Sequence, residues 1–193
     1  MNTLNFDELK DADRMDEDTL RAVMKRFGGD VWNYIYYLTS SREQADGLAQ
    51  EVFVKCYYRI GTYRGGSSFQ TWLFSIARNA VFSYRKSRFF RTSLWGDIAA
   101  LPDRTERIGV NAGGGMVVAA SAEMQYFSSM HVNEIWDVIM KLPAGFREAL
   151  VLDLKYGMSV KDIAELTGWS QGTVKSRLYR ARRKVQSKLK EME

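Results

Sequence analysis

The sequence predicts an all-α protein made of two small helical domains joined by a flexible linker. Apolar residues recur at spacings of three and four over most of the 193 residues, which is typical of amphipathic helices. Only two prolines, Pro102 and Pro143, interrupt this pattern. The period disappears between about residues 87 and 130, where Gly113-Gly114-Gly115 occurs, and such a long aperiodic segment predicts a linker. We therefore expect an acidic segment at 1–20, a domain at 21–92, a linker at 93–131 and a second domain at 132–193.

The first domain is expected to begin with three helices, at about residues 18–27, 30–38 and 41–61. Ser40 or Ser41 is the expected cap of the third helix, and Gly61 its end. The residues that the spacing places inward are Val31, Ile35, Leu38, Leu48, Val52, Phe53 and Cys56. Cys56 is most simply a small buried apolar residue.

A fourth helix begins after Ser67 or Ser68, either of which can cap it. Its predicted inner stripe holds Phe69, Trp72, Leu73, Ile76, Ala77, Ala80 and Tyr84. The opposite side holds Thr71, Phe74, Arg78, Phe82 and Arg85. Arginine interleaved with phenylalanine on an outward face suits stacking on bases combined with neutralisation of phosphates. The competing interpretation is a contact with a partner helix, since exposed apolar groups also mark protein interfaces.

The second domain is expected to contain four helices, and the last two form a helix-turn-helix. The first should place Ile135, Val138, Ile139 and Leu142 on one side, and the second runs from Pro143 to Gly157. Ser159 and Ser170 are the expected caps of the last two helices, and Gly168 allows a left-handed turn between them. The inward residues of the last helix are Val174, Leu178, Ala181, Val185 and Leu189.

The charge distribution predicts two separate contacts with a polyanion. The net charge is +5, but the first 20 residues carry seven acids against two bases. Residues 52–96 contain eight bases and no acid, and residues 170–190 again contain eight bases and no acid. Two acid-free basic blocks favour nucleic acid as the ligand, the competing interpretation being ordinary solvated faces.

Several function classes are excluded by composition. One cysteine and one histidine allow neither a disulfide framework nor a Cys/His zinc site. No carboxylate cluster lies in either basic block, so metal-dependent phosphoryl chemistry is not expected, and we predict no catalysis, metal or cofactor. No apolar run approaches the roughly 20 residues of a membrane span, and the acidic N-terminus is unlike a signal peptide. We expect a cytoplasmic protein.

The outer face of the last helix is the predicted site for duplex DNA. It presents Thr173, Ser176, Arg177, Arg180, Arg183 and Lys184. The short polar first turn, Ser170 to Thr173, can enter a major groove, and its backbone N–H groups can hold a phosphate. Gln171, Lys175 and Arg177 are the candidates for base edges, whereas the later arginines are expected to grip phosphates. A basic surface helix without a ligand is the alternative.

Two sets of motifs in this order resemble bacterial RNA polymerase sigma factors of the extracytoplasmic-function (ECF, group 4) subfamily. The N-terminal set is Gln50-Glu51 with Phe53, then Phe69, Thr71-Trp72-Leu73 and Ile76-Ala77-Arg78-Asn79. The C-terminal set is Leu142-Pro143 with Arg147, Ile163-Ala164, Gly172 through Arg177, and Arg180-Ala181-Arg182. Gly47 and Ser83 stand where the family commonly has acids.

The resemblance implies a dissociable subunit that binds RNA polymerase core, recognises and melts promoter DNA, and has no catalysis of its own. It implies core binding by Asp46, Gln50, Glu51 and Phe53. It implies minus-ten binding, through a flipped base in the loop 61–68, by Tyr63, Arg64, Gly65, Ser67, Ser68, Gln70, Trp72, Phe74, Arg78, Asn79 and Arg85. It implies minus-thirty-five binding by Ser170, Gln171, Gly172, Thr173, Lys175, Ser176, Arg177, Arg180 and Arg183.

The family also implies a cognate anti-sigma factor, often attached to the membrane. The alternative is a helix-turn-helix transcription regulator that binds an operator without the polymerase. A dimer on a symmetric site would favour that alternative. It does not explain the aromatic and basic first domain.

Overall fold

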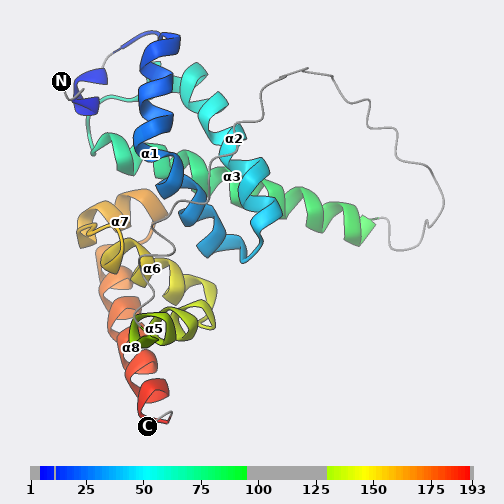
Figure 1. The fold of residues 1–193 in the computed structure, drawn as a ribbon, viewed down its shortest axis with the longest axis vertical. Helices are drawn as coiled ribbons and strands as arrows, with labels where there is room; N and C mark the ends of the chain where they lie inside the picture. Colours follow the sequence, from blue (N-terminus) through cyan, green and yellow to red (C-terminus); the bar gives the residue numbers. More distant parts are fainter. Residues whose placement is uncertain (1–4, 11, 95–129, 192–193) are drawn as a thin grey trace.

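The computed structural model describes residues 5–10, 12–94 and 130–191, and all regular elements within these ranges are helical. Most of the expected linker, 93–131, falls on residues 95–129, outside the described ranges, and described helices extend two residues into it at each end. As Figure 1 shows, α1, α2 and α3 form one group of helices and α5 to α8 form a second group beside it. None of the described helices is both long and apolar enough to cross a membrane.

The first helix is longer than the sequence pattern suggested. The residues expected to form two helices form one, α1, Glu17–Thr39, which passes without interruption through Gly28 and Gly29. Two glycines in a helix interior cost about 1 kcal/mol each relative to alanine, and burial of the inner face offsets that cost. Val31 and Ile35 are fully buried, as predicted.

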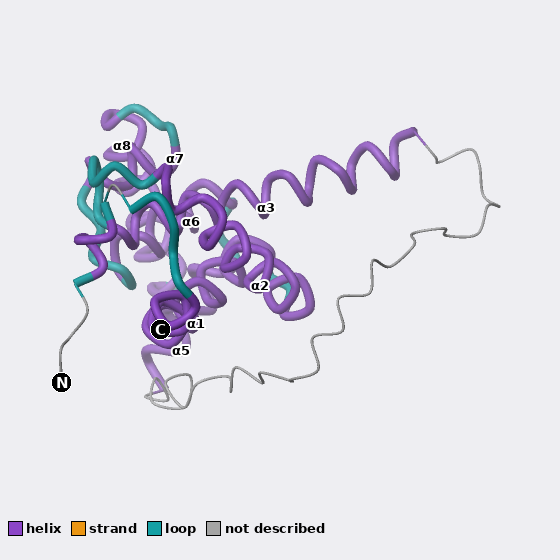
Figure 2. Tube along the Cα trace, turned by 90° about the horizontal axis from the view of Figure 1, so that it is seen from above, coloured by secondary structure: helices purple, strands orange, loops and turns teal. Residues whose placement is uncertain are grey.

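The next two helices build the core of the N-terminal domain. Helix α2, Arg42–Arg59, is capped by Ser41, whose side chain accepts a hydrogen bond from the N–H of Gln44. A short 3-10 turn, η2, Ile60–Thr62, follows it. Helix α3, Phe69–Leu94, continues past the expected boundary near residue 87 and projects away from the other helices in Figure 2. Ser68 is its cap, because its Oγ accepts from the N–H of Thr71 at 3.1 Å.

The C-terminal domain contains the predicted helix-turn-helix. Helices α5, Met130–Met140, and α6, Ala144–Leu154, precede it, with Pro143 at the start of α6. Ser159 forms a capping box with Asp162 at the start of α7, Val160–Thr167. Gly168 adopts the left-handed conformation with φ of 72°, and Ser170 caps α8, Gln171–Lys190. Ile135 is exposed rather than inward, unlike Val138, Ile139 and Leu142.

The two domains pack directly against each other. Helix α6 lies against α1, and α7 lies against α3. The buried apolar residues of both domains form one continuous cluster. The sequence pattern predicted the two domains but not this contact, because residues that pack between domains have the same spacing as residues that face a ligand.

Candidate nucleic-acid interface

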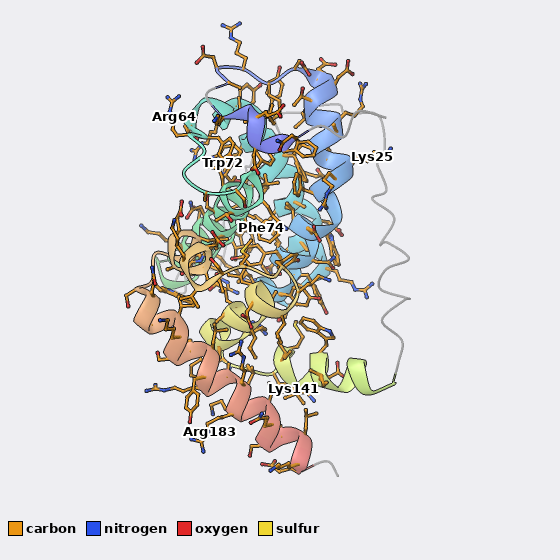
Figure 3. The ribbon with its side chains drawn as sticks, turned by 90° about the vertical axis from the view of Figure 1, so that its left-hand side faces the viewer. Lys25, Arg64, Trp72, Phe74, Lys141 and Arg183 are labelled. Atoms are coloured by element: carbon orange, nitrogen blue, oxygen red, sulfur yellow. The ribbon has the colours of Figure 1, made fainter. Side chains whose placement is uncertain are left out.

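Helix α8 presents the basic face that its sequence predicts. Val174, Leu178, Ala181 and Val185 are buried against the rest of the domain. Exposed on the other side are Gln171, Gly172, Lys175, Ser176, Arg180, Arg183 and Lys184. In Figure 3, Arg183 points outward from α8, away from both domains. Such a face can neutralise phosphates along a groove while its first turn approaches base edges.

Arg177 is the exception among the α8 residues expected to contact DNA. Its guanidinium carbon lies 3.7 Å from the centre of the Trp169 ring, a cation–π distance. A Cβ atom at Gly145 would lie 2.8 Å from Nη1 of Arg177, so the glycine makes room for this arginine. Arg177 is therefore half-buried between α6 and the turn before α8, rather than extended toward a base edge.

The loop before α3 is exposed at its tip and anchored at both ends. Arg64, Gly65, Gly66 and Ser68 are exposed, and Gly65 has a positive φ of 69°, which favours glycine. Tyr63, only 2% exposed, packs edge-on against Phe69. Tyr63 was expected to touch DNA, but in this structure its ring is part of the core and supports the loop from that side.

The outward face expected on α3 is wrong at two of its positions. Phe74 has no exposed surface and Thr71 only 3%. Phe74 stacks on Tyr34 at 4.8 Å and meets Tyr156 of the C-terminal domain edge-on at 4.8 Å. Figure 3 shows Phe74 in the interior of the molecule, where it has no exposed surface. The C-terminal domain covers this part of α3.

Arg78 forms a buried ion pair across the domain boundary. Its Nε donates to Oε1 of Glu148 at 2.7 Å, and the side chains are 15% and 4% exposed. The same carboxylate oxygen accepts from the hydroxyl of Tyr34 at 2.9 Å. Burial, and next the negative charge of Glu148, raise the pKa of Tyr34 well above its usual value. In this arrangement the charge of Arg78 is therefore paired with a protein carboxylate rather than with a phosphate.

The remaining residues expected at the minus-ten element differ in how exposed their side chains are. Asn79 and Ser68 are exposed, and Ser67, Gln70 and Trp72 are half-buried. Arg85 instead donates to the carbonyl of Leu38 at the end of α1. Arg147, from the other domain, donates to Oγ of Ser40 at 3.2 Å, so arginines of both domains meet the C-terminus of α1.

Helix α2 carries an exposed face opposite its buried one. Gln50 and Glu51 lie on it, and Asp46 accepts a hydrogen bond from Nε1 of Trp32 at 2.6 Å. Phe53 was expected there but is 6% exposed and belongs to the core. Val54 and Tyr58, 56% and 80% exposed, complete the face. Their position four and eight residues after Gln50 is the sequence signal that identifies them.

Comparisons with known protein families agree with this architecture. Residues 23–89 match the family "Sigma-70 region 2", and residues 133–185 match "Sigma-70, region 4". The chain is 32% identical over 149 residues to the ECF RNA polymerase sigma-E factor of Haemophilus influenzae, covering 77% of this chain and 76% of that one. It is 28% identical over 174 residues to the sigma-E factor of Escherichia coli K12, covering 90% and 88% of the two chains.

Solved structures share the fold. The sigma factor RpoE of Bartonella quintana, in complex with the anti-sigma factor NepR, superposes with a TM-score of 0.63. That match covers 91% of this chain and 98% of the other at 23% identity. CnrH, solved with the cytosolic domain of CnrY, gives a TM-score of 0.60 at 20% identity over 92% of each chain. The chain belongs to the ECF sigma factors, the non-catalytic subunits that direct transcription initiation by RNA polymerase.

Proposed function

We propose that this sigma factor binds polymerase core through α2, reads one melted promoter strand with the loop 63–68, and reads upstream duplex DNA with α8. The observation that carries the proposal is the pair of exposed polar surfaces on separate domains. One is a glycine-containing loop and the other is the basic face of a helix-turn-helix. A loop suits an unpaired base and a helix suits a major groove.

The loop has the properties that capture of an unstacked base requires. Flipping a base out of a stack costs a few kcal/mol, which contacts with the protein must offset. Gly65 and Gly66 allow the backbone to approach a base closely, and Ser67, Ser68 and Gln70 offer hydrogen-bonding groups. Tyr63 and Phe69 hold the ends of the loop from the core.

The exposed face of α2 fits a protein partner. Val54 and Tyr58 are apolar and largely exposed, and Gln50 and Glu51 lie beside them. A surface that combines an exposed aromatic residue with polar neighbours is typical of interfaces. We assign this face, made of Asp46, Gln50, Glu51, Val54 and Tyr58, to the polymerase core. Phe53 contributes by packing beneath it.

Release of the C-terminal domain is part of the proposed mechanism. Phe74 and Arg78 cannot touch DNA while Tyr156 and Glu148 cover them. The closed arrangement therefore represents the free chain, and promoter binding requires the two domains to separate. The related fold of RpoE was solved with an anti-sigma factor. We propose that a cognate anti-sigma factor binds this chain too and keeps the domains from engaging promoter DNA.

The test is reconstituted transcription on genomic promoter fragments. Polymerase core, the purified chain, and both together are compared by mapping the 5′ ends of the transcripts. We expect specific new starts only when both proteins are present. Tight binding of the free chain to a symmetric operator, with no effect on core polymerase, would instead favour a polymerase-independent regulator.

A further inference from the structure

A segment outside both family matches completes the loop before α3. The matches cover residues 23–89 and 133–185, so residues 5–10 precede them. These residues form the short turn η1, Phe6–Leu9, which contacts α3. The segment is acidic, whereas residues 52–96 contain no acid at all. It therefore supplies the loop with a carboxylate that its own part of the chain lacks.

Asp7 joins the two ends of the loop. Its Oδ1 accepts from the hydroxyl of Tyr63 at 3.0 Å and from the backbone N–H of Phe69 at 2.8 Å. The hydroxyl of Tyr63 also lies 3.1 Å from the carbonyl oxygen of Ser67. Oδ1 of Asp7 thus fixes both Tyr63, just before the exposed tip of the loop, and Phe69, just after it. The N-terminus of α3 also favours a negative charge there.

Two neighbours of Asp7 hold the segment against the loop. The ring of Phe6 lies 5.2 Å from that of Phe27 and 5.9 Å from that of Phe69, which anchors η1 against the core. On the other side, a Cβ atom at Gly65 would lie 3.2 Å from Cβ of Lys10. The stem of Lys10 therefore packs on the backbone of the loop at its left-handed glycine.

We propose that Asp7 is a positioning residue for base selection, because it sets the shape of the loop 63–68 that receives the unpaired base. This inference rests on the proposed function of the loop. Asp7 does not touch the base. It acts through Tyr63 and Phe69, and a loop without this tether can adopt several shapes and accept several bases. The expected defect is therefore in selectivity rather than in DNA affinity as a whole.

The experiment uses the complete chain with polymerase core. The strongest promoter found in the genomic transcription test is randomised at its minus-ten positions, transcribed, and its productive templates are sequenced. Asp7→Ala should lower the preference for the favoured base roughly tenfold, the size expected for losing a hydrogen bond to a charged group. Asp7→Asn keeps an acceptor oxygen and should restore most of the preference. Binding of α8 to upstream duplex DNA should be unchanged.

Asp13→Ala is the matched control, because Asp13 is an exposed acid six residues after Asp7, still ahead of α1. It should retain the preference of the unmodified chain. If Asp7→Ala and Asp13→Ala lost the base preference equally, the effect would come from charge alone, and the inference would be overturned. An unchanged base preference in Asp7→Ala would overturn it too. Should Asp7→Ala fail to fold, Tyr63→Phe removes one of the two hydrogen bonds and keeps the ring. It should lose part of the preference, and full retention would contradict the inference. Absence of any base preference in the unmodified chain would instead defeat the proposed function of the loop.

Discussion

Glu148 is a carboxylate with almost no exposed surface, and both of its hydrogen-bonding partners come from the other domain. Burial of a charge is costly unless the charge is paired, and here Arg78 and Tyr34 pair with it. Removing one partner of such a pair destabilises the contact by about 3–5 kcal/mol, because it leaves the other charge buried and unpaired. Separation of the domains relieves that cost, since water then reaches Arg78.

Glu148→Ala should therefore open the molecule without unfolding it. We expect a larger radius of gyration in small-angle X-ray scattering and helical circular dichroism close to that of the unmodified chain. The matched control is Asp153→Asn in the same helix, because Asp153 pairs with Arg182 within the C-terminal domain at 2.8 Å. A radius of gyration that Glu148→Ala leaves unchanged would contradict the role of this ion pair in holding the domains together.

Two tyrosines and the cysteine make the fold sensitive to alkaline pH. Burial raises the pKa of Tyr37, Tyr63 and Cys56 to about 12. Between their usual values and pH 12 the unfolded chain loses these protons while the folded chain keeps them. The stabilisation that these three groups give the fold is thus fully present below about pH 8.5, the usual pKa of cysteine, and is lost as pH rises toward 12.

The free energy of unfolding in urea should fall steadily from about pH 9 to pH 12. Tyrosinate absorbance of the buried groups should appear with unfolding rather than before it. Tyr63→Phe removes one of the titrating groups and should make the fall shallower. A stability that stays level up to pH 12 would show that these groups titrate normally in the folded chain.

At the scale of helices, most of the fold could be predicted from the sequence. Ser41, Ser159, Ser170 and Gly168 mark helix ends where the structure has them. The inner stripe of α8 was also correct, because one face of that helix is buried within its own domain. The break expected near Gly28 was wrong, since tertiary packing overrides the low helix propensity of glycine.

The outer face of α3 shows what the sequence could not predict. Phe74 is covered by a residue 82 positions later in the chain, and spacing along one helix carries no information about such a contact. Arg78 has the same basic character whether it faces a phosphate or Glu148. On α8, Ser176, Arg180, Arg183 and Lys184 are exposed as expected, whereas Thr173 and Arg177 are half-buried. The glycines at the tip of the loop are also exposed as expected, because short-range signals determine turns.

The effect of a substitution in α8 should depend on whether the side chain contacts a phosphate or a base edge. Arg183→Ala is expected to weaken duplex binding about equally on all sequences and to lower the dependence on salt by about one unit of logarithmic slope, as loss of a phosphate contact does. Lys175→Ala, near the start of the helix, should cost about 1–3 kcal/mol on the preferred duplex alone. Electrophoretic mobility shifts at several salt concentrations distinguish the two.

Lys188→Ala provides the control for these variants, because Lys188 lies at the far end of α8 and pairs with Glu191 at 2.7 Å. It should leave duplex binding nearly unchanged. Equal effects of all three substitutions would mean that α8 contributes only general positive charge. In that case the duplex would be read by another part of the chain.

The exposed face of α2 makes a separate prediction. Tyr58→Ala should weaken binding to polymerase core about tenfold or more, because exposed aromatic residues contribute strongly to interfaces. Its side chain is 80% exposed, so thermal stability should change little. Surface plasmon resonance with immobilised polymerase core measures the affinity. Unchanged core affinity would show that the polymerase binds elsewhere on the chain.

On the scale of the whole molecule, the closed packing affects the two surfaces proposed to bind DNA. The C-terminal domain leaves the outer face of α8 and the tip of the loop 63–68 exposed, while it covers Phe74 and Arg78. If the proposed assignments hold, the free chain can meet duplex DNA through α8, but it cannot use the covered part of α3 on a melted strand. Under the proposed function, full engagement of a promoter is coupled to separation of the domains, and we expect any partner that stabilises the closed form to oppose it.

Fluorescence energy transfer between the domains tests this coupling most directly. Dyes on Arg26→Cys in α1 and Lys161→Cys in α7 report the separation, because Tyr156, just before α7, donates to the carbonyl of Asp30 in α1 at 3.0 Å in the closed form. Cys56 does not interfere because it is buried and burial raises its thiol pKa. We predict high transfer in the free chain and low transfer once polymerase core and promoter DNA are bound. High transfer in a transcriptionally active complex would contradict the separation of the domains.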